Sequence, residues 1–238
     1  MATLNLLYKK NFVINDYISI RIPRVEKILK CEDDYYSVVS MLTAMPVDLM
    51  VQLDDIGIDF AAINEWELFT FLFGTLKDCD TSLIFKGVDL KSFKPAIDPK
   101  NSNLIFVDPH TGAKIDRTIH REIANALRKI HHIDKNNRKP ANNEAKAYMI
   151  ERARSKQRRR RKRISDSQLE SLIIALVNTE QFNYKFDDVR KLSIYQFNES
   201  VRQTISKIDY DNRMHGVYAG TISAKDLSQD DLNWLIHK

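Results

Sequence analysis

The sequence has little glycine, proline and cysteine, and each shortage excludes a class of protein. Six glycines and six prolines in 238 residues are too few for a turn-rich β-sandwich, so helices are favoured. Two cysteines outside any CxxC pair, Cys31 and Cys79, exclude a disulfide framework. No apolar run approaches the roughly 18 residues that a membrane-spanning helix needs. The opening residues Met1 to Tyr8 lack a signal-peptide pattern, so we expect a protein of the reducing cytoplasm.

Motifs for nucleotide binding and nucleophilic catalysis are also missing. No Walker loop, GxGxxG, GxSxG or CxxC occurs, and these are the patterns that such chemistry needs. His120, His131 and His132 do not have the HExxH spacing of a zinc helix,. The last two close a predicted helix, where the dipole favours imidazole without any ligand role. We therefore expect no catalytic residues, no metal, no cofactor and no enzyme.

Four carboxylates remain as candidates for a divalent-metal site. Asp54, Asp55, Asp59 and Glu65 carry the oxygen ligands that Mg²⁺ prefers. Neighbouring acids on a helix point apart, however, and an acidic helix is usually a solvated face. A metal-dependent nuclease is therefore a minor hypothesis, with divalent-dependent cleavage as its test.

What the sequence does contain is a local concentration of positive charge. Residues 152–163 hold nine cations in twelve positions, six of them consecutive, whereas the other 28 Lys and Arg face all 32 Asp and Glu. We predict that this Arg-rich segment binds a polyanion or an acidic protein surface, because either relieves its self-repulsion. The predicted polyanion-binding residues are Arg152, Arg154, Lys156, Arg158, Arg159, Arg160, Arg161, Lys162 and Arg163.

Two further interpretations of the Arg-rich segment stay open. It is equally well explained as a solvated charged helix or tether. If it binds DNA, six to nine phosphate contacts would make affinity steeply salt-dependent. Sequence-specific reading is not expected, because no paired Cys/His, RNP-type strand or heptad repeat accompanies it. Base stacking on the segment is not expected either, because it has no aromatic residue and the nearest, Tyr148, lies about a turn before it.

The hydrophobic pattern predicts an α+β protein that is predominantly helical. A hairpin over 4–22 is followed by helices, among them 65–77 with Asn64 as its cap,. Three short runs within 81–116 predict a small antiparallel meander. A helix capped by Asp116 or Thr118 closes this N-terminal α+β domain, residues 1–133.

The C-terminal half, residues 144–238, is predicted to be a helical region that contains the Arg-rich segment. A polar stretch with Pro140, residues 134–143, is the predicted hinge. Ser167 and Glu170 have capping-box spacing for an apolar helix, and a long helix is predicted over 193–215. A last short helix is predicted near residues 231–236, capped by Ser228 and Asp231,.

Several stretches together resemble a family of tailed-phage proteins from viruses of Gram-positive bacteria, encoded among tail and baseplate genes. The stretches are residues 35–46, 52–57, 126–134, 138–145, 192–202 and 209–220, and the resemblance extends over most of the chain. The closing pattern, Gly216-Val-Tyr-Ala-Gly220 and then Leu227 to Trp234, is similar to that of baseplate-hub or tail-assembly chaperone-type proteins.

The resemblance implies a non-enzymatic tail or baseplate structural or assembly factor, located in the host cytoplasm or in the virion. Its partners would be phage tail or baseplate proteins, DNA or an acidic protein surface, with no membrane and possible self-association. An assembly factor needs apolar helical faces. The predicted partner-binding residues are Tyr195, Phe197, Val201, Ile205 and Ile208, with ordinary core as the alternative explanation for each. The alternative function is that of a nucleic-acid-binding accessory protein.

Overall fold

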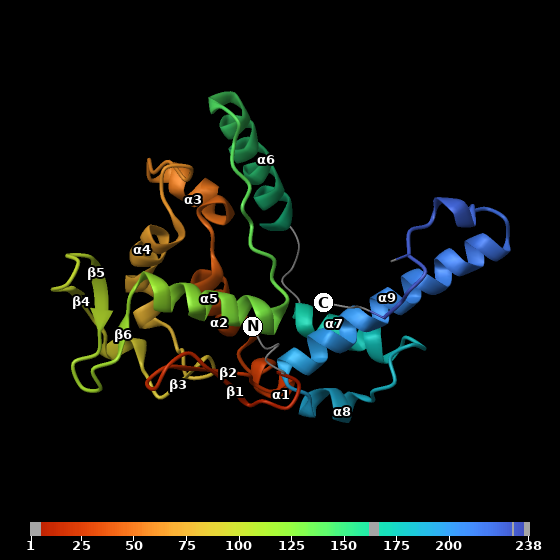
Figure 1. Ribbon diagram of the computed structural model, residues 1–238, viewed down its shortest axis with the longest axis horizontal. Helices are drawn as coiled ribbons and strands as arrows, with labels where there is room; N and C mark the ends of the chain where they lie inside the picture. Colours follow the sequence, from red (N-terminus) through yellow and green to blue (C-terminus); the bar gives the residue numbers. More distant parts are fainter. Residues whose placement is uncertain (1–5, 162–166, 230, 236–238) are drawn as a thin grey trace. The chain divides into compact units, whose positions relative to one another are not determined.

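The structure is a computed structural model that describes residues 6–161, 167–229 and 231–235 (Figure 1). It is 53% helical and has two small antiparallel three-stranded sheets, which confirms the predicted α+β, mainly helical class. Contacts divide the chain into two compact units. Unit 1 comprises Met1–Pro23 and Lys30–Asp166, and unit 2 comprises Arg24–Leu29 and Ser167–Lys238. Among the described residues, no helix is long and apolar enough to cross a membrane.

The first sheet of unit 1 is a hairpin joined by one distant strand. Strands β1 (Asn11–Val13) and β2 (Ser19–Arg21) pair antiparallel, so the predicted hairpin is confirmed, with its first strand later than the predicted Leu6–Tyr8. The third strand, β3 (Phe85–Lys86), pairs with β2. The sequence analysis assigned the stretch that ends at Phe85 to the predicted meander. It pairs with β2 instead, and this could not be predicted because a two-residue strand carries no local signal of its partner.

The predicted meander forms the second sheet with different members. It comprises β4 (Lys94–Ile97), β5 (Leu104–Val107) and β6 (Lys114–Ile115), preceded by the 3₁₀ helix η2 (Leu90–Ser92). Its Phe106 ring stacks on Phe73 with centroids 3.7 Å apart. The sheet is thereby anchored to a helix through buried aromatic side chains.

Helices build the rest of unit 1, and local caps set where several of them begin. They are α2 (Glu32–Thr43), the 3₁₀ helix η1 (Pro46–Leu49), α3 (Met50–Asp55), α4 (Glu65–Asp78) and α5 (Arg117–His131). Asn64 accepts hydrogen bonds from the Trp66 and Glu67 amides, and Asp116 accepts from Thr118 and Ile119. The Asn64 cap was predicted, and Asp116 is one of the two caps, Asp116 or Thr118, predicted for α5, because capping depends on a few neighbouring residues.

Helix α6 (Asn143–Arg161) carries the first part of the Arg-rich segment and belongs to unit 1. It packs against α3, as Figure 1 shows. Met149 and Ile150 are half-buried against a core cluster of Val47, Leu53, Phe60 and Leu68. The contacts therefore divide the chain after Asp166, beyond the predicted hinge at 134–143, because α6 packs back on the preceding domain.

Unit 2 is built from helices. They are α1 (Val25–Ile28), α7 (Gln168–Val177), α8 (Phe186–Lys191), α9 (Ile194–Tyr218) and the 3₁₀ helix η3 (Ala224–Asp226). The Val25 amide donates to the Leu192 carbonyl at 2.9 Å, so α1 joins α8 although it lies far away in the sequence. The Ser167 cap on α7 was predicted.

The C-terminal segment folds back along α9. Gln203 Nε2 and Ser206 Oγ both donate to the Trp234 carbonyl, and Arg213 pairs with Asp231 at 3.0 Å. Ser228 and Asp231 are hydrogen-bonded to each other as expected of caps. The predicted last helix is nevertheless wrong for the described residues 231–235, which form turns and bends, because their polar contacts go to α9.

Candidate polyanion-binding face

Helix α6 has two faces with different surroundings. Its inner face, half-buried against the rest of unit 1, carries Ala145, Lys146, Met149, Ile150, Ala153, Arg154 and Gln157. These positions recur at helical spacing. Its exposed residues include Glu144, Ala147, Glu151 and Ser155 as well as Tyr148, Arg152, Lys156, Arg158 and Arg159. The last five are called the outer face below.

The inner face is attached by ion pairs to the acids that the sequence offered as metal ligands. Arg154 Nη2 lies 2.7 Å from Asp54 Oδ2 and 2.6 Å from Asp55 Oδ1. Lys146 Nζ lies 2.9 Å from Asp59 Oδ2. The hydrogen bond to Lys146 holds the pKa of Asp59 below its ordinary value, and those to Asp54 and Asp55 raise the pKa of Arg154. The three aspartates therefore hold Arg154 and Lys146 of α6 in position.

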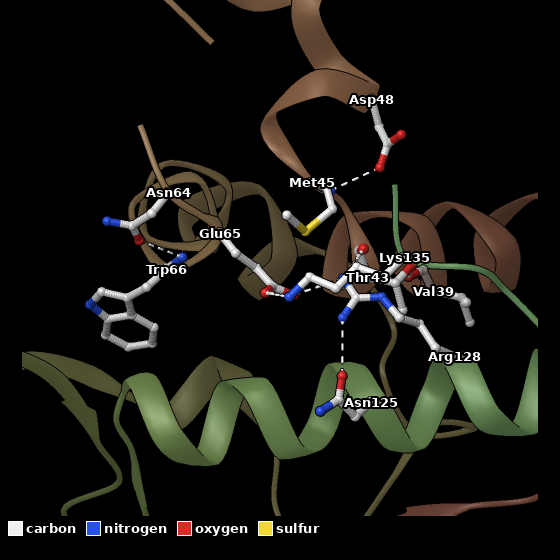
Figure 2. Close-up of polar contacts among 10 residues, drawn as sticks. All are labelled: Val39, Thr43, Met45, Asp48, Asn64, Glu65, Trp66, Asn125, Arg128 and Lys135. Carbon is white, nitrogen blue, oxygen red and sulfur yellow. Dashed lines mark hydrogen bonds and ion pairs between the residues drawn. The ribbon is translucent and has the colours of Figure 1, made fainter. Parts of the chain in front are cut away.

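The fourth of those acids, Glu65, belongs to a buried cluster shown in Figure 2. Arg128 Nη2 donates to Glu65 at 2.7 Å and to the Thr43 carbonyl at 2.5 Å, and Lys135 Nζ donates to Glu65 at 2.6 Å. Burial by itself would raise the pKa of Glu65, but the bonds from Lys135 and Arg128 outweigh it and lower the pKa. Glu65 therefore stays ionised and joins α4 to α5.

Among the described residues, no group of three or more His, Cys, Asp or Glu side chains has the arrangement of a metal site. Two of the histidines considered as metal ligands, His120 and His131, make separate contacts within unit 1. His120 stacks on Phe69 with centroids 4.0 Å apart, and His131 Nε2 lies 3.0 Å from the Tyr35 hydroxyl. Burial lowers the pKa of both imidazoles to about 4, so they are neutral at pH 7.

The outer face concentrates positive charge without carboxylate partners. In the described part of the chain, no carboxylate pairs with Arg152, Lys156, Arg158 or Arg159. Tyr148, Arg152, Lys156 and Arg159 follow one another at spacings of four, four and three residues, so they lie on one side of the helix. A row of like charges on one side of a helix attracts polyanions.

The structure places four of the nine predicted polyanion-binding residues, Arg152, Lys156, Arg158 and Arg159, on the outer face, and it assigns Arg154 to the inner face. Arg160 and Arg161 end α6. Lys162 and Arg163 lie outside the described residues. The sequence missed the division between the two faces, because the run is almost uniformly cationic and has little apolar periodicity. The two half-buried residues Met149 and Ile150 were the available signal.

The predicted partner-binding residues all lie on α9 in unit 2. Phe197 is fully buried in the core of that unit, whereas Ile205 is 51% exposed. Tyr195, Val201 and Ile208 are half-buried. The core position of Phe197 matches the alternative explanation offered for it, and the partner-binding role of the set stays a prediction.

Comparison with known proteins gives one family match. A family described as YomV second domain matches residues 158–237, which comprise the end of the Arg-rich segment and most of unit 2. No curated protein matches the chain, and no solved structure does. The matched family is phage-associated, and this chain is similar to it over 80 of its 238 residues, which supports a phage protein.

Proposed function

We propose that this protein is a non-enzymatic, nucleic-acid-binding accessory protein of a phage, which uses the outer face of α6. The observation that carries the proposal is the separation of charge on this helix. Arg154 and Lys146 are paired with carboxylates on the inner face, whereas the exposed cations Arg152, Lys156 and Arg159 have no carboxylate partner among the described residues. Phosphates are the ligands that a row of unpaired Lys and Arg side chains attracts irrespective of sequence.

The test is binding of a labelled DNA duplex across a salt series. The outer-face variant Arg152→Gln/Lys156→Gln/Arg159→Gln removes three phosphate contacts, so the slope of log K against log salt falls by about 3. The matched control is Arg154→Gln on the inner face, which leaves the slope unchanged. An outer-face variant that binds with the slope of the unmodified protein would refute the proposal.

A second candidate is the phage tail or baseplate assembly factor. The observation that favours it is the apolar surface of unit 2, the unit with the phage-family match. Leu172, Ile174 and Phe186 are 38%, 49% and 50% exposed, and Ile205 on α9 is 51% exposed. Exposed apolar side chains mark protein interaction sites when they form a continuous patch.

The assembly candidate is tested by co-purification of the tagged protein with phage structural proteins. Ile174→Asp and Ile205→Asp would abolish co-purification with a tail or baseplate protein and leave DNA binding intact. The outer-face variant is the matched control and keeps the protein partner. Recovery of the same phage proteins with both Asp variants would count against this function.

A further inference from the structure

A pocket of about 310 Å³ in unit 1 lies apart from the outer face of α6. Its lining combines apolar side chains, one carboxylate and four Lys or Arg side chains. Figure 2 shows Met45, Glu65 and Lys135 around the buried Arg128. This volume is at the lower end of the range for small-molecule sites.

The wall made by residues 135–140 is held in place at two points. Lys135 is bonded to Glu65 at 2.6 Å, and Asn136 Nδ2 donates to Asp48 Oδ1 at 2.8 Å. The following residues, Arg138 and Lys139, line the pocket. The stretch predicted as a hinge therefore forms one side of a concave site.

Positive charge exceeds negative charge in the pocket. Its lining has four cations and one carboxylate, Glu65, and that carboxylate already bonds Arg128 and Lys135. Within the described ranges, no carboxylate lies at ion-pair distance from Arg117, Arg138 or Lys139. An anion in the pocket would relieve their repulsion, and two guanidinium groups favour the forked geometry of phosphate.

The apolar part of the lining indicates that the anionic group of the ligand is attached to an apolar or aromatic group. Met45, Pro46, Phe60 and Ile63 line the same space, and an inorganic ion would leave them in contact with water. A flat heterocycle would bury them, and the Asn137 amide in the lining adds a donor and an acceptor for its polar edge.

We infer that this pocket binds a nucleoside phosphate, with the phosphate at Arg117, Arg138 and Lys139 and the base on the apolar wall. A mononucleotide in this pocket needs none of the outer-face residues, so the inference stands without the proposed function. An acidic peptide with an apolar side chain is the competing ligand class. It lacks the dianionic group that two arginines and a lysine suit best.

Isothermal titration with adenosine 5′-monophosphate tests the inference. We expect saturable binding that weakens at least about tenfold in Arg138→Gln/Lys139→Gln, since two charge-assisted contacts are lost. Both residues are exposed, so the fold is retained, and circular dichroism checks this. The outer-face variant is the matched control and binds the mononucleotide as the unmodified protein does.

Adenosine and inorganic phosphate serve as separate probes, and each binds more weakly than the mononucleotide if both halves of the pocket are used. The inference is overturned if the mononucleotide does not bind or binds the double variant equally well. It is also overturned if inorganic phosphate binds as tightly, because the apolar wall is then unused. Tighter binding of a peptide that combines Glu with an apolar side chain would assign the pocket to a protein ligand instead.

Discussion

Arg154 and Asp54 lie one hundred residues apart in the sequence, and their side chains meet at 2.7 Å. Asp55 Oδ1 lies 2.6 Å from the same guanidinium, so one residue of the Arg-rich segment pairs with two acids of α3. This contact orients α6, because one side of the helix is tied down and the opposite cations face solvent.

The double variant Asp54→Asn/Asp55→Asn is expected to loosen α6 without unfolding unit 1. The ion pairs are a third to a half exposed, so they contribute little to global stability, and the melting temperature changes by less than about 2 °C. Amide hydrogen exchange in α6 becomes a few-fold faster. Unchanged exchange in α6 would mean that Met149 and Ile150 alone hold the helix.

The variant Arg128→Met is expected to destabilise unit 1 by about 3 kcal/mol. The side chain of Arg128 is 6% exposed and that of Glu65 is 13% exposed. Glu65 pairs with Arg128 and Lys135, and the change removes Arg128, the more buried of these two cations. Urea denaturation measures the loss. The control Lys135→Met removes the more exposed cation, and its cost stays below about 1 kcal/mol. Equal costs for the two variants would contradict this account.

Acid is expected to destabilise the protein between about pH 6.5 and pH 4. Burial lowers the pKa of His120 and His131 to about 4, whereas the unfolded chain takes up these protons near pH 6.5. The unfolded state therefore binds more protons in this window. Stability is complete above it and falls by up to about 1.4 kcal/mol per pH unit for each histidine.

The variant His120→Phe separates this effect from other titrations, because the ring can still stack on Phe69. Denaturant unfolding at several pH values is expected to show a shallower pH slope for this variant. A slope that is the same in this variant and in the unmodified protein would show that His120 does not titrate on unfolding.

The variant Tyr148→Ala is expected to weaken binding of single-stranded DNA more than binding of duplex. Tyr148 is 63% exposed and lies one turn before Arg152 on the same side of α6, where an unpaired base can stack on its ring. Stacking contributes about 1–3 kcal/mol per base, which corresponds to a loss of at least fivefold. Anisotropy titrations with a single strand and its duplex measure the ratio. An equal loss for both would exclude stacking.

The sequence alone determined the mainly helical class and the starts of several helices. Asn64 and Ser167 cap α4 and α7 as predicted, and α5 is capped by Asp116, one of the two residues predicted for it, because a cap depends on residues within one turn. It also identified the Arg-rich segment as the place where positive charge collects, since charge density is a property of the chain itself.

Only the tertiary structure decided which partners these elements have. The pairing of β3 with β2, the packing of α1 on α8 and the contact of Arg154 with Asp54 all join residues far apart in the sequence. Such contacts follow from how distant apolar faces pack, and no local pattern encodes them. The division of the Arg-rich helix into a paired and an unpaired face therefore follows from the fold, because a run of like charges looks the same on every side until something packs against it.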